Sequence, residues 1–155
     1  MNINYVNGDA TAPIGDKHKT IIHCCNNKGG WGKGFVLSLS NKWSLPEKIY
    51  RSRLDYVLGE IMIVNVESDI TVINMVCQNG FRSKDNPTPL DYAALAICLD
   101  NVYKYCKFKN TSVHCPRIGC GLAGGNWEYI EELLKHAFID NNIPVTVYDY
   151  GVPNG

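Results

Sequence analysis

Residues 116–128 read Pro-Arg-Ile-Gly-Cys-Gly-Leu-Ala-Gly-Gly-Asn-Trp-Glu, and this stretch decides how the rest of the chain is interpreted. It joins an apolar segment typical of a strand to an amphipathic segment typical of a helix. Four glycines in it can adopt positive φ without a steric penalty, so neighbouring backbone N–H groups can turn outward together and meet an anion. The following helix adds its own unpaired N–H groups. An empty glycine-rich turn is the alternative, because a single glycine loop is a weak signal.

Composition narrows the class of protein. The chain has 155 residues, of which 45% are hydrophobic and 19% charged, and we expect residues 1–155 to form a single soluble domain. No apolar run approaches the roughly 18–20 residues needed to span a bilayer, and no secretory signal is visible at the start. Fifteen basic and fifteen acidic residues cancel, so there is no overall charge signal for nucleic acid or for a membrane surface.

The cysteines indicate a cellular compartment rather than a site. There are seven, an odd number, and their spacing fits neither a zinc site nor a disulfide framework. We therefore predict buried thiols in a reducing, intracellular and cytoplasmic location, with no metal and no cofactor.

The apolar periodicity predicts an α/β fold. Strands are expected near residues 3–6, 20–25, 60–66, 70–77, 112–118 and 145–148, and helices near residues 35–45, 47–53, 91–106 and 126–138. The segments 60–66 and 70–77 suit a hairpin, and their nearly continuous apolar character predicts that both of their faces are covered. This order favours three α/β/α layers around a central mixed sheet, followed by a polar tail after Tyr150.

Ligands of such sheets collect beyond the carboxyl ends of the strands. This places Asp9, the loop 26–34 and the loop 119–125 along one edge, if their strands run in the same direction. Two glycine loops suit a diphosphate, which needs N–H donors from both sides. Neither loop has a P-loop or Rossmann fingerprint. Asp9 can accept a hydrogen bond from an exocyclic amine such as that of adenine, or can stabilise a turn.

Several side chains beside these loops have two interpretations each. His23 can act as a general acid or base, or can be a satisfied core histidine. Asn26 can bind ribose hydroxyls or serve its loop, and Trp31 can cover a sugar or plug the loop. Tyr148 and Tyr150 can stack on a base or form the aromatic rim of the core.

Cys120 lies among N–H groups that are expected to lower the pKa of its thiol, yet no partner histidine or carboxylate is evident. Catalysis by a nucleophilic cysteine is therefore disfavoured. His18, His114 and His136 receive no role.

Four motifs in this order resemble a macro domain, and the resemblance covers nearly the whole chain. They are Asn-Gly-Asp at 7–9, Asn26 with Gly-Gly-Trp-Gly-Lys-Gly at 29–34, Asn-Met-Val-Cys-Gln at 74–78, and the segment 116–127. The resemblance implies an ADP-ribose-binding α/β/α domain in which Asp9 holds adenine. It also implies that residues 26–35 surround the distal ribose and phosphate, and that residues 117–123 cradle the diphosphate.

Within that family, the loop 29–34 is most similar to the branch of ADP-ribose 1''-phosphate phosphatases. A neighbouring branch removes ADP-ribose from protein carboxylates with a lysine and an aspartate. This chain has Gln78 and Ala123 at the corresponding positions, and neither side chain can supply an amine nucleophile or a carboxylate base.

The resulting prediction is an enzyme that binds ADP-ribose and hydrolyses ADP-ribose 1''-phosphate, mainly by positioning and electrostatic stabilisation. We predict His23 and Asn26 as catalytic residues, a monomeric protein, and ADP-ribose or its 1''-phosphate as the partner. The predicted substrate-binding residues are Gly8, Asp9, Ala10, Cys25, Asn26, Gly30, Trp31, Gly32, Lys33, Gly34, Phe35, Gln78, Arg117, Ile118, Gly119, Cys120, Gly121, Leu122, Ala123, Tyr148 and Tyr150.

Two alternatives keep the same binding site. One is a module that binds ADP-ribose without chemistry, and the other is a hydrolase of ADP-ribosyl or O-acetyl-ADP-ribose esters. An RNA-binding domain is disfavoured, because the charge is neutral and no sheet face combines aromatic and basic residues.

Overall fold

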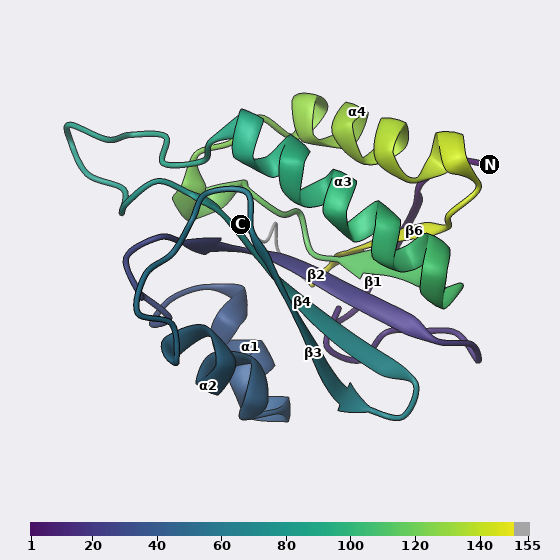
Figure 1. Ribbon diagram of the computed structural model, residues 1–155. Coiled ribbons are helices and arrows are strands. Elements are labelled where there is room, and N and C mark those ends of the chain that lie inside the picture. The colour runs from purple at the N-terminus through teal and green to yellow at the C-terminus, as the bar shows by residue number, and fades with distance from the viewer. Residues whose placement is uncertain (151–155) are drawn as a thin grey trace.

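A mixed sheet of six strands lies between two layers of helices in the computed structural model, which describes residues 1–150 (Figure 1). The strand order is β1-β6-β5-β2-β4-β3. The strands are β1 (Asn4–Asn7), β2 (Lys19–Asn26), β3 (Ile61–Glu67), β4 (Ile70–Gln78), β5 (Ser112–Cys115) and β6 (Val145–Asp149). The predicted three-layer α/β/α fold is thus confirmed. The polar tail expected after Tyr150 lies outside the described residues.

The strand directions determine where a ligand can bind. β1 runs parallel to β6, β6 to β5, β5 to β2 and β2 to β4, and among the pairings of these six strands only that of β3 with β4 is antiparallel. The carboxyl ends of β1, β2, β4, β5 and β6 therefore meet at one edge of the sheet. Asp9 and both glycine loops leave the sheet at this edge, as expected.

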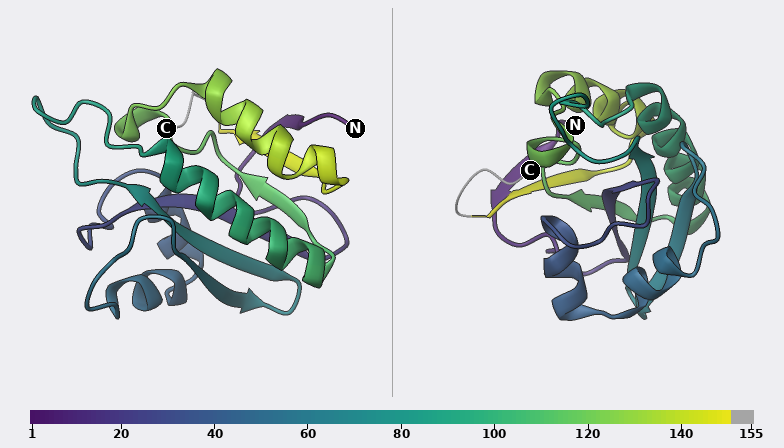
Figure 2. Two further views of the ribbon diagram at one scale, coloured as in Figure 1. Left: turned by 45° about the horizontal axis from the view of Figure 1, so that its top comes forward. Right: turned by 90° about the vertical axis from the view of Figure 1, so that its left-hand side faces the viewer.

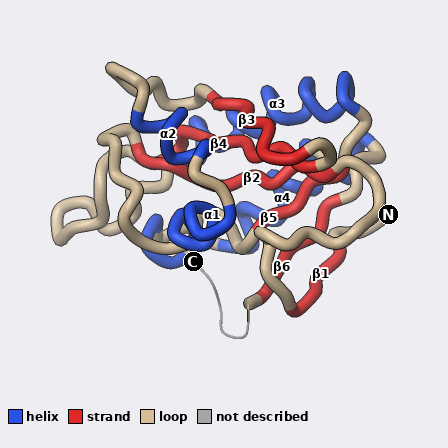
Figure 3. The backbone as a smooth tube through the Cα atoms, turned by 90° about the horizontal axis from the view of Figure 1, so that it is seen from below, coloured by secondary structure: helices blue, strands red, loops and turns tan. Residues whose placement is uncertain are grey.

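Two pairs of helices cover the two faces of the sheet (Figures 1 and 3). On one face α3 (Tyr92–Lys109) and α4 (Trp127–Ala137) pack over a core that includes Leu95 and Leu134. On the other face α1 (Phe35–Lys42) and α2 (Leu45–Arg51) enclose a smaller core around Leu39. Two short 3-10 turns, η1 (Gly121–Ala123) and η2 (Ile139–Asn141), flank α4.

The helix starts follow local chemistry. The predicted N-cap of α4 is confirmed, because the side-chain oxygen of Asn126 accepts from the backbone N–H of Glu128 at 2.9 Å. Asp91 caps α3 in the same way, accepting from Ala94 at 2.9 Å. Pro46 sits in the first turn of α2, where its missing N–H costs nothing.

The prediction that both faces of the 60–66 strand are covered was wrong. β3 is the edge strand, and its side chains alternate between buried Met62 and Val64 and outward-facing Ile63, which is 47% exposed. Its neighbour β4 is buried from Ile70 to Cys77, as expected. A continuous apolar run does not reveal whether a helix reaches across the outer strand.

Within residues 1–150, no helix is both long enough and apolar enough to cross a membrane. The same residues contain no cluster of three or more His, Cys, Asp or Glu side chains suited to a metal ion.

Candidate functional site

Two cavities meet at the carboxyl edge of the sheet and form one cleft with two lobes. Figure 2 shows the same sheet and its flanking helices from two further directions. The large lobe has a volume of about 390 Å³ and lies between the segments that follow β2, β4 and β5. The small lobe, of about 250 Å³, lies beside the end of β1 and of β6. Gly34, Phe35 and Pro116 line both lobes, so the two lie directly beside each other.

The first glycine loop presents bare backbone to the large lobe. None of the backbone N–H groups of residues 31–36 has a hydrogen-bond acceptor within the part of the chain that the structure describes. Gly34 has a φ of 81°, which favours glycine, and it leads directly into α1. A run of free N–H groups that ends in a helix N-terminus is an anion-binding surface.

Asn26 holds this loop in place. Its side-chain oxygen accepts from the N–H groups of Lys28 and Gly30 at 2.9 and 3.0 Å, and its Nδ2 donates to the carbonyl of Gly30 at 2.9 Å. The buried hydroxyl of Tyr50 lies 2.6 Å from the Asn26 carbonyl and accepts from Gly29 at 3.1 Å. Of the two interpretations of Asn26, the structure supports a residue that shapes its loop.

Trp31 plugs the loop rather than covering the cleft. Only 3% of the residue is exposed, and its Nε1 donates to Ser40 at 2.8 Å. Its ring packs edge-on against His23 and tilted against Tyr50. The indole therefore anchors the glycine loop to the core beneath α1.

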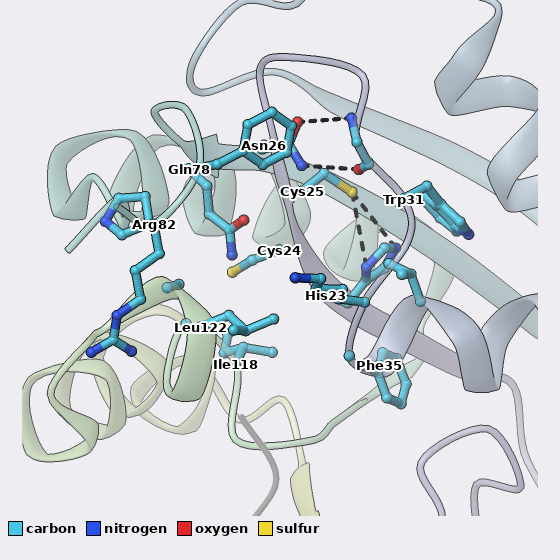
Figure 4. A pocket seen from close by; sticks show the side chains of 18 of the residues that line it. His23, Cys24, Cys25, Asn26, Trp31, Phe35, Gln78, Arg82, Ile118 and Leu122 are labelled. Atoms are coloured by element: carbon cyan, nitrogen blue, oxygen red, sulfur yellow. Dashed lines mark hydrogen bonds between the residues drawn. The ribbon is translucent and has the colours of Figure 1, made fainter. Parts of the chain in front are cut away.

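His23 lies in the wall of the large lobe and is 2% exposed (Figure 4). Its Nε2 pairs with the side-chain oxygen of Asn74, whose Nδ2 is committed to donating to Pro46, so Nε2 carries the proton. Burial lowers the pKa of His23 to about 4, which keeps the ring neutral at pH 7. These features match a satisfied core histidine better than a general acid or base.

The second glycine loop forms the opposite wall. The N–H groups of Gly119, Gly121 and Leu122 have no acceptor among residues 1–150. Close packing also requires glycine at two positions of this loop: a Cβ on Gly125 would lie 2.4 Å from the carbonyl oxygen of Gly119, and one on Gly119 would lie 2.9 Å from the Leu90 side chain. In this loop glycine allows both the close packing of the fold and the exposure of backbone N–H groups.

Cys120 lines the large lobe, but its predicted pKa shift had the wrong direction. Burial raises the pKa of the Cys120 thiol and outweighs the opposing effect of Arg117. Gln78 and Ala123 also line the lobe. The side-chain amide of Gln78 points into the cavity in Figure 4 and has no partner among the described residues.

The small lobe contains one carboxylate and one exposed aromatic ring. Asp9 Oδ1 accepts from the N–H and the hydroxyl of Thr11, both at 2.8 Å, which leaves Oδ2 without a partner in the described chain. Tyr150 lines the lobe and is 59% exposed. Tyr148 is 1% exposed and its hydroxyl bonds to His114 and Ile14, so it belongs to the core.

Arg117 does not line either lobe, so its side chain does not cradle a ligand there. Its guanidinium forms a two-point ion pair with Asp149 at 2.7 and 3.0 Å. The rings of Tyr5 and Trp127 flank it, each with its centroid at 5.1 Å. Gly8 and Gly121 are likewise absent from the linings. Arg117 instead ties the second glycine loop to the end of β6.

The remaining predicted residues come together as expected from their order in the chain. Ala10 lines the small lobe, and the large lobe is lined by Cys25, Gly30, Gly32, Lys33, Ile118 and Leu122. Sequence reasoning missed the lining residues Cys24, Val36, Ser38, Gly80, Phe81, Arg82, Pro89 and Pro116. The only available signal for Phe81 and Arg82 was that their polar segment follows a central strand at the ligand edge.

The charges of the two lobes differ. No carboxylate is among the residues that line the large lobe, whereas its cations are Lys33 and Arg82. The small lobe has Asp9 as its carboxylate. The cleft therefore suits a ligand with a hydrogen-bond donor at one end and anionic groups toward the other.

The chain is similar to solved structures of other proteins over nearly its whole length. A protein of unknown function from Bacteroides thetaiotaomicron is 49% identical, with a TM-score of 0.92 over 96% of this chain and 98% of that one. A macrodomain protein from Streptomyces coelicolor is 43% identical, with a TM-score of 0.84 over 97% of this chain and 100% of that one. No family model matches the chain.

Curated relatives are more distant. Chromodomain-helicase-DNA-binding protein 1-like from Mus musculus is 31% identical over 95% of this chain, and the chain spans only 18% of that protein's length. An ADP-ribose 1''-phosphate phosphatase from Lodderomyces elongisporus is 26% identical over 94% of this chain and 99% of that one. The ADP-ribose glycohydrolase OARD1 of Homo sapiens is 26% identical over 94% of this chain and 90% of that one. Because the Streptomyces protein is similar over its entire length and shares the layered sheet, the chain belongs to the macrodomain family.

Proposed function

We propose that the protein binds ADP-ribose in the two-lobed cleft. The observation that carries the proposal is the pair of glycine loops, whose backbone N–H groups at residues 31–36 and at Gly119 and Leu122 lack acceptors in the described chain, on both sides of one cavity. Adenine would occupy the small lobe, with its amine on Asp9 and its ring against Tyr150. The diphosphate would lie between the glycine loops, and the distal ribose would enter the large lobe. The names of the yeast and human relatives support this ligand.

We further propose that the bound substrate is ADP-ribose 1''-phosphate and that the reaction releases phosphate. The free N–H groups of residues 31–36 would bind the phosphoryl oxygens and stabilise their charge in the transition state. The amide of Gln78 is free to orient a water molecule. His23 and Asn26 would act by holding the wall and the loop, since both side chains are already hydrogen-bonded.

Phosphate release from ADP-ribose 1''-phosphate tests the reaction. We expect release above the buffer rate, together with binding of free ADP-ribose in calorimetry. Tight binding of ADP-ribose without release would reject the phosphatase and leave a binding module. Two features favour that second function: the pKa of buried His23 is lowered to about 4, which makes the ring a weak base, and the Asn26 side chain is occupied by its own loop.

Asp9 provides a test of the adenine position. In the variant Asp9→Asn, the oxygen that accepts from Thr11 can be kept, but an amide N–H₂ replaces the free Oδ2. Two donors would then face each other, and we expect the affinity for ADP-ribose to fall by roughly 10-fold or more. The measurement is the dissociation constant by calorimetry.

The matched ligand control is inosine diphosphate ribose, which lacks the exocyclic amine of adenine. The native protein should bind it more weakly than ADP-ribose, and the variant should lose this discrimination. An unchanged preference in the variant would place the adenine elsewhere.

A further inference from the structure

The segment of residues 79–86, which we call the strap, crosses from β4 to the mouth of the large lobe, and the proposed reaction does not use it. It is internally bonded: Ser83 and Asn86 exchange two backbone hydrogen bonds of 3.0 and 3.1 Å. The side chain of Asn86 also donates to the carbonyls of Asn79 and Phe81, at 2.9 and 3.0 Å. The strap therefore has a defined shape without a ligand.

One side of the strap rests on the first glycine loop. The N–H of Gly80 donates to the side-chain oxygen of Asn27 at 2.9 Å. The ring of Phe81 lies directly over Gly30, where a Cβ would come within 2.4 Å of the ring carbon Cε1. Phe81 lines the large lobe although the residue is 58% exposed. It forms part of the rim on this side.

Arg82 reaches the other glycine loop. Its Nη1 donates to the carbonyl of Gly121 at 2.9 Å. Figure 4 shows Arg82 across the cavity from Trp31 and Phe35, beside the segment that carries Leu122. No carboxylate lies within 4 Å of this guanidinium in residues 1–150. The positive charge at the mouth is thus uncompensated by an ion pair, and most of its donors remain available.

We propose that Arg82 determines specificity, favouring ADP-ribose whose distal ribose carries an anionic group over unmodified ADP-ribose. The inference rests on the proposed function, because it assumes that the distal ribose lies in the large lobe. A guanidinium forms two parallel hydrogen bonds with phosphate oxygens, and the Gly121 contact fixes the fork in place. Lys33 adds a second cation to the same lobe.

The test compares Arg82→Gln with Lys84→Gln, which removes the same charge from the exposed tip of the strap and lines neither lobe. The dissociation constant of ADP-ribose should change less than about twofold in both variants. For ADP-ribose 1''-phosphate, Arg82→Gln should lower kcat/KM roughly tenfold, mainly through KM, and Lys84→Gln should not. If no phosphate is released, the dissociation constant of the 1''-phosphate replaces kcat/KM.

The outcomes separate the two proposals. Absence of ADP-ribose binding by the native protein would overturn the proposed function. Normal ADP-ribose binding with equal losses for both ligands in Arg82→Gln would overturn the specificity role and make Arg82 a tether of the loop. Arg82→Lys keeps the charge but lacks the planar fork, and it replaces Arg82→Gln if that variant unfolds. An unchanged preference for the 1''-phosphate over ADP-ribose in the variant that folds would also reject the inference.

Discussion

Gly32→Glu should abolish detectable ADP-ribose binding while leaving the fold intact. A Cβ on Gly32 would meet no atom within 4 Å, and the residue does not require positive φ, so the backbone tolerates a side chain. The new carboxylate would enter a lobe lined by free N–H groups and would compete with the ligand's phosphates for them. Juxtaposed like charges cost several kcal/mol, so we expect a loss of roughly 100-fold or more. Calorimetry with ADP-ribose measures it.

Gly32→Ala is the matched control, because it adds the Cβ without the charge. It should bind ADP-ribose within about threefold of the native protein, and both variants should keep the native melting temperature, as expected for a surface substitution. Undiminished binding by Gly32→Glu would show that the anionic part of the ligand does not lie on this loop.

Acidification between pH 6.5 and pH 4 should strongly destabilise the protein. Burial lowers the pKa of His23 and of His114 to about 4 in each case, whereas an unfolded histidine has a pKa of about 6.5. In this interval the unfolded chain binds protons that the folded chain does not, so stability is complete above pH 6.5 and falls toward pH 4. Each histidine contributes about 3 kcal/mol to this loss. Urea unfolding at several pH values measures it.

The slope of the unfolding free energy against pH identifies the residues responsible. His114→Gln should reduce the slope between pH 6.5 and pH 4, even though it lowers stability at pH 7, because Tyr148 and Ser112 lose their present partner. His136→Gln, at an exposed position, should leave the slope unchanged. A native slope near zero in this interval would contradict the assignment.

Most of the fold follows from apolar periodicity. Central strands such as β2 and β4 are apolar because both faces are covered, and the N-cap at Asn126 marks the start of α4 within one residue. The exposed face of β3 was not predictable, because the local sequence does not show how far the helices extend across the sheet toward its edge strand.

The sequence predicted the parts of the candidate site that are formed by backbone N–H groups better than the parts that are formed by side chains. Glycine-rich loops after parallel strands indicate exposed N–H groups at the ligand edge. The partners of a side chain depend on the tertiary structure. The sequence therefore could not show that Arg117 forms an ion pair with Asp149, or that Asn74 accepts a hydrogen bond from His23. The strap residue Arg82 was missed because a single arginine in a polar loop has no local signal.

The free N–H groups of residues 31–36 have a consequence for how the protein can change over generations. Every residue type except proline supplies the same donor, so recognition of the phosphates depends on the course of the backbone and little on the identity of the side chains. Substitutions at Lys33 or Phe35 can then change the side chains around the substrate while the backbone N–H groups still bind its phosphates. Such a cleft can acquire new chemistry, or lose its chemistry, without first losing its ligand.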